Sequence, residues 1–114
     1  MPVSSLGCAL ESPIGITGVC PRRDVLSQQR RISGHVETLT AMLDKDSGIE
    51  PDDIRLTDVS LGPGYGRLND ATVKALQLTA QCEGLFFDPV YTAKTIAGLF
   101  HFVQRQKISG NVLF

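Results

Sequence analysis

The sequence predicts an α/β fold with three layers, in which helices cover both faces of a mostly parallel sheet. Two observations support this prediction. Short, β-branched apolar runs alternate with longer segments of helical periodicity, and a glycine-rich segment directly follows the second apolar run. The chain has 114 residues, which is close to the size of one domain. We therefore expect a single α/β domain over residues 1–114, with residues 1–12 as an N-terminal lead-in.

The first elements are a strand and a long helix. Residues 14–20 form a short β-branched run typical of a strand buried on both faces, and Pro21 ends it. Asp24 or Ser27 is expected to cap the following helix, and the apolar stripe consists of Val25, Ile32, Val36, Leu39 and Leu43.

Two glycines and a histidine mark this helix. Ser47 and Gly48 are expected to end it, because glycine accepts the left-handed conformation of a helix terminus. Gly34, in its middle, is expected to mark close packing against the sheet. His35 is expected to be exposed, since no second histidine or cysteine lies at a metal-ligand spacing.

Residues 54–59 predict a second strand, and residues 61–66, with the sequence LGPGYG, form a loop. Asn69 or Asp70 then caps a second helix that ends at Gly84. The expected buried face of this helix consists of Val73, Leu76 and Ala80.

A third helix is predicted over residues 92–106. Its expected buried residues are Ile96, Leu99, Phe100 and Val103. We interpret His101 as a packing or partly exposed residue. Residues 112–114, with the sequence VLF, are typical of the beginning of a strand.

Composition excludes several classes of function. The formal net charge is −1, and the arginines at positions 22, 23, 30 and 31 are interpreted as a solvated surface, so we expect no nucleic-acid partner. No apolar run has the length of a membrane span, and the first 20 residues lack the pattern of a secretory signal. The three cysteines show no zinc spacing and are expected to be buried thiols. We expect a cytoplasmic protein without membrane or metal.

The loop at residues 61–66 is the first candidate for function. Active sites in parallel sheets lie at the carboxyl ends of strands, and this loop follows the second predicted strand. By pattern alone, a plain turn and a ligand-binding loop both remain open.

The loop and three further motifs together support the ligand-binding interpretation. GPGYG at residues 62–66, EGL at 83–85, DPVYTAK at 88–94 and AGL at 97–99 together resemble the C-terminal part of the D-cysteine desulfhydrase and aminocyclopropane-carboxylate deaminase family. This resemblance covers residues 13–114. It implies a tryptophan-synthase-β-like fold, pyridoxal phosphate as cofactor, a small amino acid as substrate and α,β-elimination to pyruvate, ammonia and sulfide.

The resemblance also assigns site residues. Tyr65 matches the loop tyrosine that faces the substrate, and Tyr91 matches the tyrosine beside the cofactor ring. We therefore expect both phenols to be catalytic and to converge on one cleft, with Tyr91, Thr92 and Gly64 binding the cofactor. Each tyrosine remains open to interpretation as a core residue.

Thr92 distinguishes two branches of the family. The deaminase branch has a glutamate here, beside the pyridine nitrogen, so threonine resembles the desulfhydrase branch. Deaminase-like activity stays an alternative, and the Thr92 hydroxyl is also suited to capping the third helix. Ala93 departs from the glycine that is usual in the family.

Other parts of the family's site are not found among these residues. The resemblance places the Schiff-base lysine, the Ser/Asn elements and the phosphate loop before this chain, and a His-Thr-Gly-Gly stretch after it, so both ends look cut. Lys94 lies beside the site but outside the family's lysine motif. We therefore expect the isolated chain to be inactive and to bind the cofactor poorly.

Two other interpretations stay open. The chain is also compatible with a non-catalytic α/β binding or assembly domain, and with the remnant of a truncated enzyme gene. In either case the apolar residues 112–114 would favour self-association or pairing with a complementing fragment.

Overall fold

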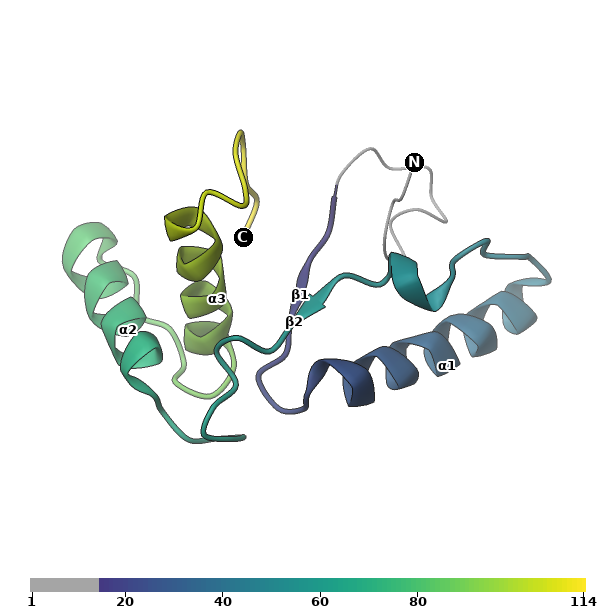
Figure 1. Cartoon of the computed structure of the whole chain (residues 1–114), viewed down its shortest axis with the longest axis horizontal. Helices are drawn as coiled ribbons and strands as arrows, with labels where there is room; N and C mark the ends of the chain where they lie inside the picture. The colour runs from purple at the N-terminus through teal and green to yellow at the C-terminus, as the bar shows by residue number, and fades with distance from the viewer. Residues whose placement is uncertain (1–14) are drawn as a thin grey trace. The chain divides into compact units, whose positions relative to one another are not determined.

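The computed structural model describes residues 15–114, so the expected lead-in at residues 1–12 lies outside the described residues. The elements follow in the order β1 (Gly18–Val19), α1 (Val25–Leu43), the 3-10 turn η1 (Pro51–Asp53), β2 (Leu56–Thr57), α2 (Asp70–Glu83) and α3 (Thr92–Gln104), as Figure 1 shows. Strands β1 and β2 form a two-stranded sheet. The predicted α/β class is confirmed, together with all three predicted helices.

The sheet is parallel and much shorter than predicted. The Gly18 N–H donates to the Arg55 carbonyl at 2.9 Å, and the Cys20 N–H donates to the Thr57 carbonyl at 2.7 Å. Both partners advance by two residues in the same direction, which is the parallel pattern. Strand pairing reaches only these positions, so the expected strands at 14–20 and 54–59 are wrong in length.

The described chain forms two compact units. Among the described residues, unit 1 contains residues 15–18 and 24–56, and unit 2 contains residues 19–23 and 57–114. The single domain over residues 1–114 stays a prediction.

In unit 1, α1 begins as predicted and ends earlier than predicted. The Asp24 carboxylate caps it, accepting the Ser27 N–H at 2.9 Å and the Ser27 hydroxyl at 2.7 Å. Asp44, at φ 48°, ends the helix in the left-handed conformation, which aspartate tolerates better than most residues. The expected stop at Ser47 and Gly48 is therefore wrong.

The predicted apolar stripe of α1 is buried at only one position. Val36 is buried, Val25 and Ile32 are partly buried, and Leu39 and Leu43 are 40% and 65% exposed. His35 is exposed, as expected.

In unit 2, α2 and α3 pack against each other around a small core (Figure 1). The core consists of Ala75, Ile96 and Ala97, flanked by the partly buried Phe87, Leu99 and Phe100. Asn69 and Gly84 cap α2 as predicted. The buried face of α2 is wrong by one position, because Thr72, Ala75 and Thr79 are buried while Val73 is 36% exposed.

Small side chains explain the face that α2 buries. Alanine and threonine allow close approach of two helices, and the threonine hydroxyls find partners inside the unit. Thr79 donates to the Ala75 carbonyl at 2.9 Å, and Thr72 donates to the Asn69 side chain at 2.8 Å. On α3, Ile96 is buried, but the predicted core residue Val103 is 54% exposed.

Two helical glycines have opposite surroundings. A Cβ at Gly98 in α3 would lie 3.0 and 3.1 Å from the Val19 methyl groups, whereas a Cβ at Gly34 in α1 would meet nothing within 4 Å. The expected close packing at Gly34 is therefore wrong. Gly98 is the glycine at which helix and strand meet.

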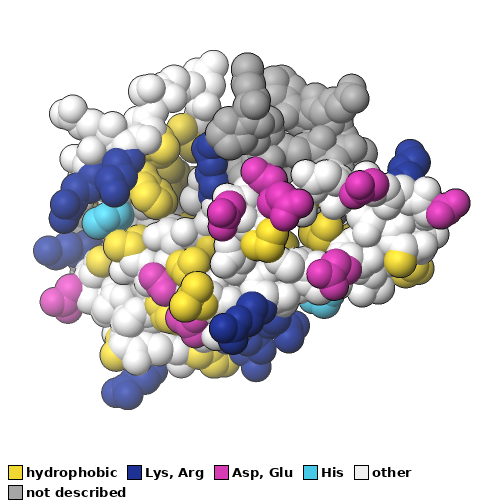
Figure 2. Space-filling view, turned by 45° about the vertical axis from the view of Figure 1, so that its right-hand side comes forward, with side chains coloured by type: hydrophobic (Ala, Val, Ile, Leu, Met, Phe, Trp, Pro, Cys, Tyr) yellow, Lys and Arg dark blue, Asp and Glu magenta, His cyan; other side chains and the backbone are white. Residues whose placement is uncertain are grey.

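Three remaining expectations concern the surface and the chain end. Residues 112–114 form no strand, and the Phe114 ring instead lies 5.8 Å from the Phe87 ring. Cys20 is buried but Cys82 is exposed, so the expected burial of the cysteines is wrong for Cys82, and Cys8 lies outside the described residues. Figure 2 shows acidic and basic side chains interspersed on the visible face. Within residues 15–114, no helix combines the length and apolar character needed to cross a membrane.

Candidate functional site

The two tyrosines singled out by the sequence meet on unit 2. Their hydroxyl groups lie 2.7 Å apart in a hydrogen bond, and their ring centroids lie 5.9 Å apart with the planes inclined by 55°. Both side chains are 47% exposed. The predicted convergence of Tyr65 and Tyr91 is therefore observed, and the pair faces solvent rather than the core.

Arg22 completes this exposed group. Its guanidinium lies 5.0 Å from the centroid of the Tyr65 ring, within the range of a cation–π interaction. The contact follows from the parallel pairing, because Arg22 follows β1 and Tyr65 follows β2, and parallel strands present their carboxyl ends at one edge. From the sequence alone, Arg22 is interpreted as part of a solvated surface, and that interpretation does not include this contact with Tyr65.

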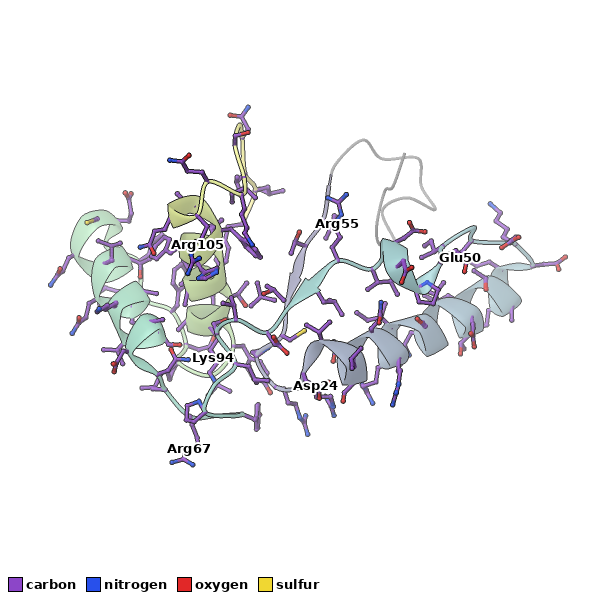
Figure 3. The ribbon with its side chains drawn as sticks, viewed as in Figure 1. Asp24, Glu50, Arg55, Arg67, Lys94 and Arg105 are labelled. Atoms are coloured by element: carbon purple, nitrogen blue, oxygen red, sulfur yellow. The ribbon has the colours of Figure 1, made fainter. Side chains whose placement is uncertain are left out.

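Tyr65 lies on the glycine loop (residues 61–66), and a buried lysine holds that loop. The Nζ of Lys94 donates to the Leu61 carbonyl at 2.6 Å and to the Gly64 carbonyl at 2.7 Å. Lys94 has no exposed surface. Figure 3 shows Lys94 at the start of α3, beside the segment that leads from β2 to α2. Burial lowers the pKa of Lys94, because the charged ammonium loses its hydration.

Two further polar side chains tie the beginning of the glycine loop to the helices. The buried Ser60 hydroxyl donates to the Lys94 carbonyl at 2.7 Å. The Asn69 amide donates to the Ser60 carbonyl at 3.0 Å and to the Gly62 carbonyl, while its oxygen accepts the Thr72 N–H at 2.8 Å. The loop is thus bonded both to α3 and to the start of α2.

Tyr91 is positioned by an aspartate turn before α3. The Asp88 carboxylate accepts the N–H groups of Val90, Tyr91 and Thr92 at 3.1, 2.7 and 3.0 Å. Interaction with the Thr92 hydroxyl, followed by the backbone N–H groups of Tyr91 and Thr92, lowers the pKa of Asp88 to about 2. The carboxylate is charged at neutral pH and accepts the first N–H of α3, that of Thr92. Tyr91 is the N-cap residue and makes no side-chain cap bond, so the expected cap by the Thr92 hydroxyl is wrong.

The hydrogen bond between the two tyrosines affects the pKa of Tyr91. The hydrogen bond with Tyr65 is the largest cause of a raised pKa at Tyr91, with desolvation second. Tyr91 therefore keeps its proton at neutral pH. In a hydrogen bond between two phenol hydroxyls, the accepting hydroxyl still has a proton to donate to a third group. The site can donate hydrogen bonds to an anion and offer an aromatic face to a flat ligand.

Two hollows of the described chain lie away from the tyrosines. A hollow of about 530 Å³ lies along α2 and α3, where Lys74, Phe100 and His101 contribute to its lining. Another of about 440 Å³ lies at the C-terminal end of α1. Neither is lined by Tyr65 or Tyr91.

Comparison with known proteins agrees with the motifs around these residues. Over 103 residues, the chain is 34% identical to the D-cysteine desulfhydrases of Salmonella paratyphi C and Salmonella choleraesuis. The chain is similar to D-cysteine desulfhydrases. The enzyme of Salmonella newport is 33% identical over the same length. Each match covers 89% of this chain and 30% of the relative.

This similarity confirms the resemblance on which the site residues were chosen. The chain spans about 30% of the length of the D-cysteine desulfhydrases that it matches. No family model matches the chain.

The sequence motifs point to the two tyrosines but not to the residues that hold them. Asp88 was detectable in principle, since an Asp-Pro pair directly before a helical pattern is typical of a side-chain-capped turn. The roles of Lys94, Ser60 and Asn69 toward the loop had no local signal, because their partners are backbone carbonyls up to 34 residues away. The roles of Tyr65, Tyr91, Thr92 and Gly64 toward a ligand stay predictions.

Proposed function

We propose that this chain supplies part of the active site of a pyridoxal-phosphate-dependent lyase that acts on a small amino acid, in the manner of D-cysteine desulfhydrase. The observation that carries the proposal is the Tyr65–Tyr91 pair, which brings together two motifs of the resemblance 26 residues apart. The similarity to D-cysteine desulfhydrases supports the substrate class. The proposal includes a C-terminal position within a three-layer, tryptophan-synthase-β-like fold, and a cytoplasmic location.

Pyridoxal phosphate supplies an electron sink that stabilises negative charge at the substrate Cα. The exposed phenols fit such a group, because each offers a flat apolar face and a hydroxyl. Lys94 does not fit as its covalent anchor. It is fully buried and its Nζ donates to two backbone carbonyls, so the lysine of that role belongs elsewhere.

In this proposal Tyr65 contacts the substrate and Tyr91 contacts the cofactor ring. The raised pKa of Tyr91 keeps this phenol protonated at neutral pH. A substrate carboxylate would accept the hydroxyl proton that is not used between the tyrosines. The pair would then orient the substrate without carrying charge itself.

Thr92 and Gly64 are the proposed cofactor contacts on either side of the pair. The Thr92 hydroxyl interacts with the Asp88 carboxylate, so contact with the pyridine nitrogen requires it to turn away from Asp88. A hydroxyl there holds no charge against the ring, which favours elimination over the deaminase-like alternative.

The test is a chimera of the Salmonella paratyphi C enzyme in which its matched segment is replaced by the corresponding 103 residues of this chain. We expect the chimera to release sulfide from D-cysteine, and Tyr65→Phe and Tyr91→Phe each to lower kcat/KM by about 10-fold or more, equivalent to one lost hydrogen bond to a charged group. Phe102→Tyr, which adds a phenol elsewhere on α3, is the control. A folded chimera whose activity is indifferent to both tyrosines would contradict the proposal.

The isolated chain gives a complementary measurement. Mixed with pyridoxal phosphate and D-cysteine, it is expected to release no sulfide, because Lys94 is not available as an anchor. Sulfide release above that of free cofactor would show that the anchor has been wrongly assigned.

A second candidate function is assembly with another polypeptide. Apolar side chains on α1 favour it, since Leu26, Met42 and Leu43 are 65%, 77% and 65% exposed. Analytical ultracentrifugation over a concentration series tests this proposal. A complex that dissociates in Met42→Glu but not in Ser33→Glu would support assembly through α1, and a monomer at every concentration would contradict it for self-association.

A further inference from the structure

Lys94 is a buried cation without a role in the proposed chemistry. Its side chain has no exposed surface, and its Nζ donates to the carbonyls of Leu61 and Gly64, at 2.6 and 2.7 Å. Burying a lysine is costly unless its donors are satisfied. The burial of Lys94 therefore depends on the hydrogen bonds that the Leu61 and Gly64 carbonyls accept from it.

The two carbonyls belong to one turn. The Gly64 N–H donates to the Leu61 carbonyl at 3.0 Å, and the Gly64 carbonyl accepts the Arg67 N–H at 3.2 Å. Each carbonyl thus accepts one backbone proton and one proton from Lys94, which uses both of its lone pairs. Tyr65 follows Gly64 directly, so the second of these bonds lies next to the phenol.

The backbone of Lys94 is also held in place. Lys94 lies in the first turn of α3, and its carbonyl accepts a hydrogen bond from the Ser60 hydroxyl at 2.7 Å. Tyr91 lies just before the same turn and is held by Asp88 at 2.7 Å. One lysine therefore connects the backbone beside Tyr65 to the helix that begins beside Tyr91.

We propose that Lys94 is a positioning residue that sets the contact between Tyr65 and Tyr91 by holding the glycine loop against the first turn of α3. The importance of this contact for catalysis rests on the proposed function, whereas the contact itself does not. A neutral amine retains two N–H donors, enough for both carbonyls, so the clamp does not depend on the charge of Lys94. This agrees with the lowered pKa of the group.

The chain offers a direct readout of the contact. It contains two tyrosines and no tryptophan, so phenolate absorbance reports on this site alone. In the unaltered 114-residue chain we expect Tyr91 to ionise in a later step of the phenolate titration, because its pKa is raised. Tyr65→Phe removes the hydroxyl partner and defines the midpoint of Tyr91 without it.

The test is Lys94→Met, with Lys74→Met on the exposed face of α2 as the matched control. Lys94→Met keeps the length and apolar stem of the side chain but removes both donors. We expect its later titration step to move at least half of the way to the Tyr91 midpoint of Tyr65→Phe, with Lys74→Met unchanged. Circular dichroism at each pH verifies that the helices persist.

The outcomes separate positioning from a general structural role. A folded Lys94→Met protein with an unchanged later step would overturn the proposal. If Lys94→Met does not fold, Lys94→Gln carries the test, and its single amide group is expected to give an intermediate midpoint. Unfolding of both would assign Lys94 to the folding of unit 2 and would also overturn it. None of these measurements uses the cofactor, so failure of the proposed function leaves them interpretable.

Discussion

Helices α1 and α3 both carry an amphipathic pattern and both begin shortly after an aspartate, but they differ in how many of their residues are buried. Of its 19 residues, α1 buries Val36, whereas α3 buries five of its 13 residues, among them Lys94 and Gly98. The periodicity of apolar residues predicts both helices equally well. It does not show which helix acquires a close partner.

The difference lies in what surrounds each helix within its own unit. The start of α3 is bonded through buried polar groups to the glycine loop, including Ser60 and Lys94. Side-chain bonds of α1 are exposed, as for Thr38 to the Gly34 carbonyl at 2.9 Å. Buried hydrogen bonds specify geometry because breaking one leaves an unsatisfied group, whereas water replaces an exposed one. The candidate site therefore lies beside the buried polar groups of unit 2, Ser60 and Lys94.

The largest expected effect contrasts the two helical glycines. Gly98→Leu is expected to destabilise the protein by about 2 kcal/mol or more, because the new side chain would overlap the Val19 methyl groups. Gly34→Leu is expected to stabilise it by about 0.5 kcal/mol, since leucine favours a helix more than glycine does. Urea unfolding measures both. Equal changes in the free energy of unfolding at Gly98 and Gly34 would contradict the difference in packing between α3 and α1.

Asn69 is expected to show the next largest effect. Asn69→Ala removes the α2 cap and the bonds to the Ser60 and Gly62 carbonyls, for an expected loss of about 2 kcal/mol. Asn69→Asp keeps the cap acceptor but loses the amide donors, so we expect about half of that loss. Asp24→Ala, which removes only an exposed cap on α1, is the comparison. A loss at Asn69→Ala no larger than at Asp24→Ala would show that the loop bonds contribute nothing.

Asp88 provides a pH-dependent test of the same contrast. Its folded-state pKa is lowered from 3.8 to about 2, so its contribution to stability is present above about pH 4 and is lost as the pH falls toward 2. Asp88→Asn should therefore be less stable than the unaltered chain at neutral pH, with a difference that disappears near pH 2. Asp24 also has a lowered pKa, caused chiefly by the Ser27 hydroxyl.

Acid unfolding of Asp88→Asn and Asp24→Asn, side by side, measures the two contributions. We expect the larger pH dependence at Asp88, because three backbone N–H groups donate to it. A larger pH dependence at Asp24 would mean that the α1 cap contributes more to stability than the Asp88 turn before α3.

The smallest expected effect concerns Arg22. Arg22→Gln removes the cation above the Tyr65 ring, with an expected cost of about 0.5 kcal/mol. It should also raise the pKa of Tyr91 further, since the charge of Arg22 lowers it. Phenolate titration measures the shift, with Arg23→Gln as the control. A shift of equal size in the control would show that net charge, not the contact, is responsible.

Local signals predicted a substantial part of the fold. Asn69 and Gly84 were correct as the caps of α2, and Asp24 was one of two proposed caps of α1, because cap preferences depend on a few neighbouring residues. The end of α1 was wrong because Asp44 adopts the left-handed conformation before Gly48 is reached. The strands were predicted too long, since their extent depends on pairing between segments far apart in the chain.

The buried face of α2 shows the limit of the pattern most clearly. Hydrophobicity favoured Val73, yet the helix buries Thr72 and Thr79, whose hydroxyls find acceptors at Asn69 and Ala75. A threonine is buried only if such a partner exists, and the sequence alone does not reveal it.

The α/β class, the three helices and the two tyrosines could be predicted from the sequence, because helix periodicity and short motifs are properties of neighbouring residues. The hydrogen bond between the phenols, the position of Arg22 over one of them and the bonds of Lys94 to the glycine loop are known from the folded structure alone. Those contacts join side chains to rings and backbone carbonyls that are distant along the chain. Their existence depends on the path of the folded backbone, which no local pattern specifies.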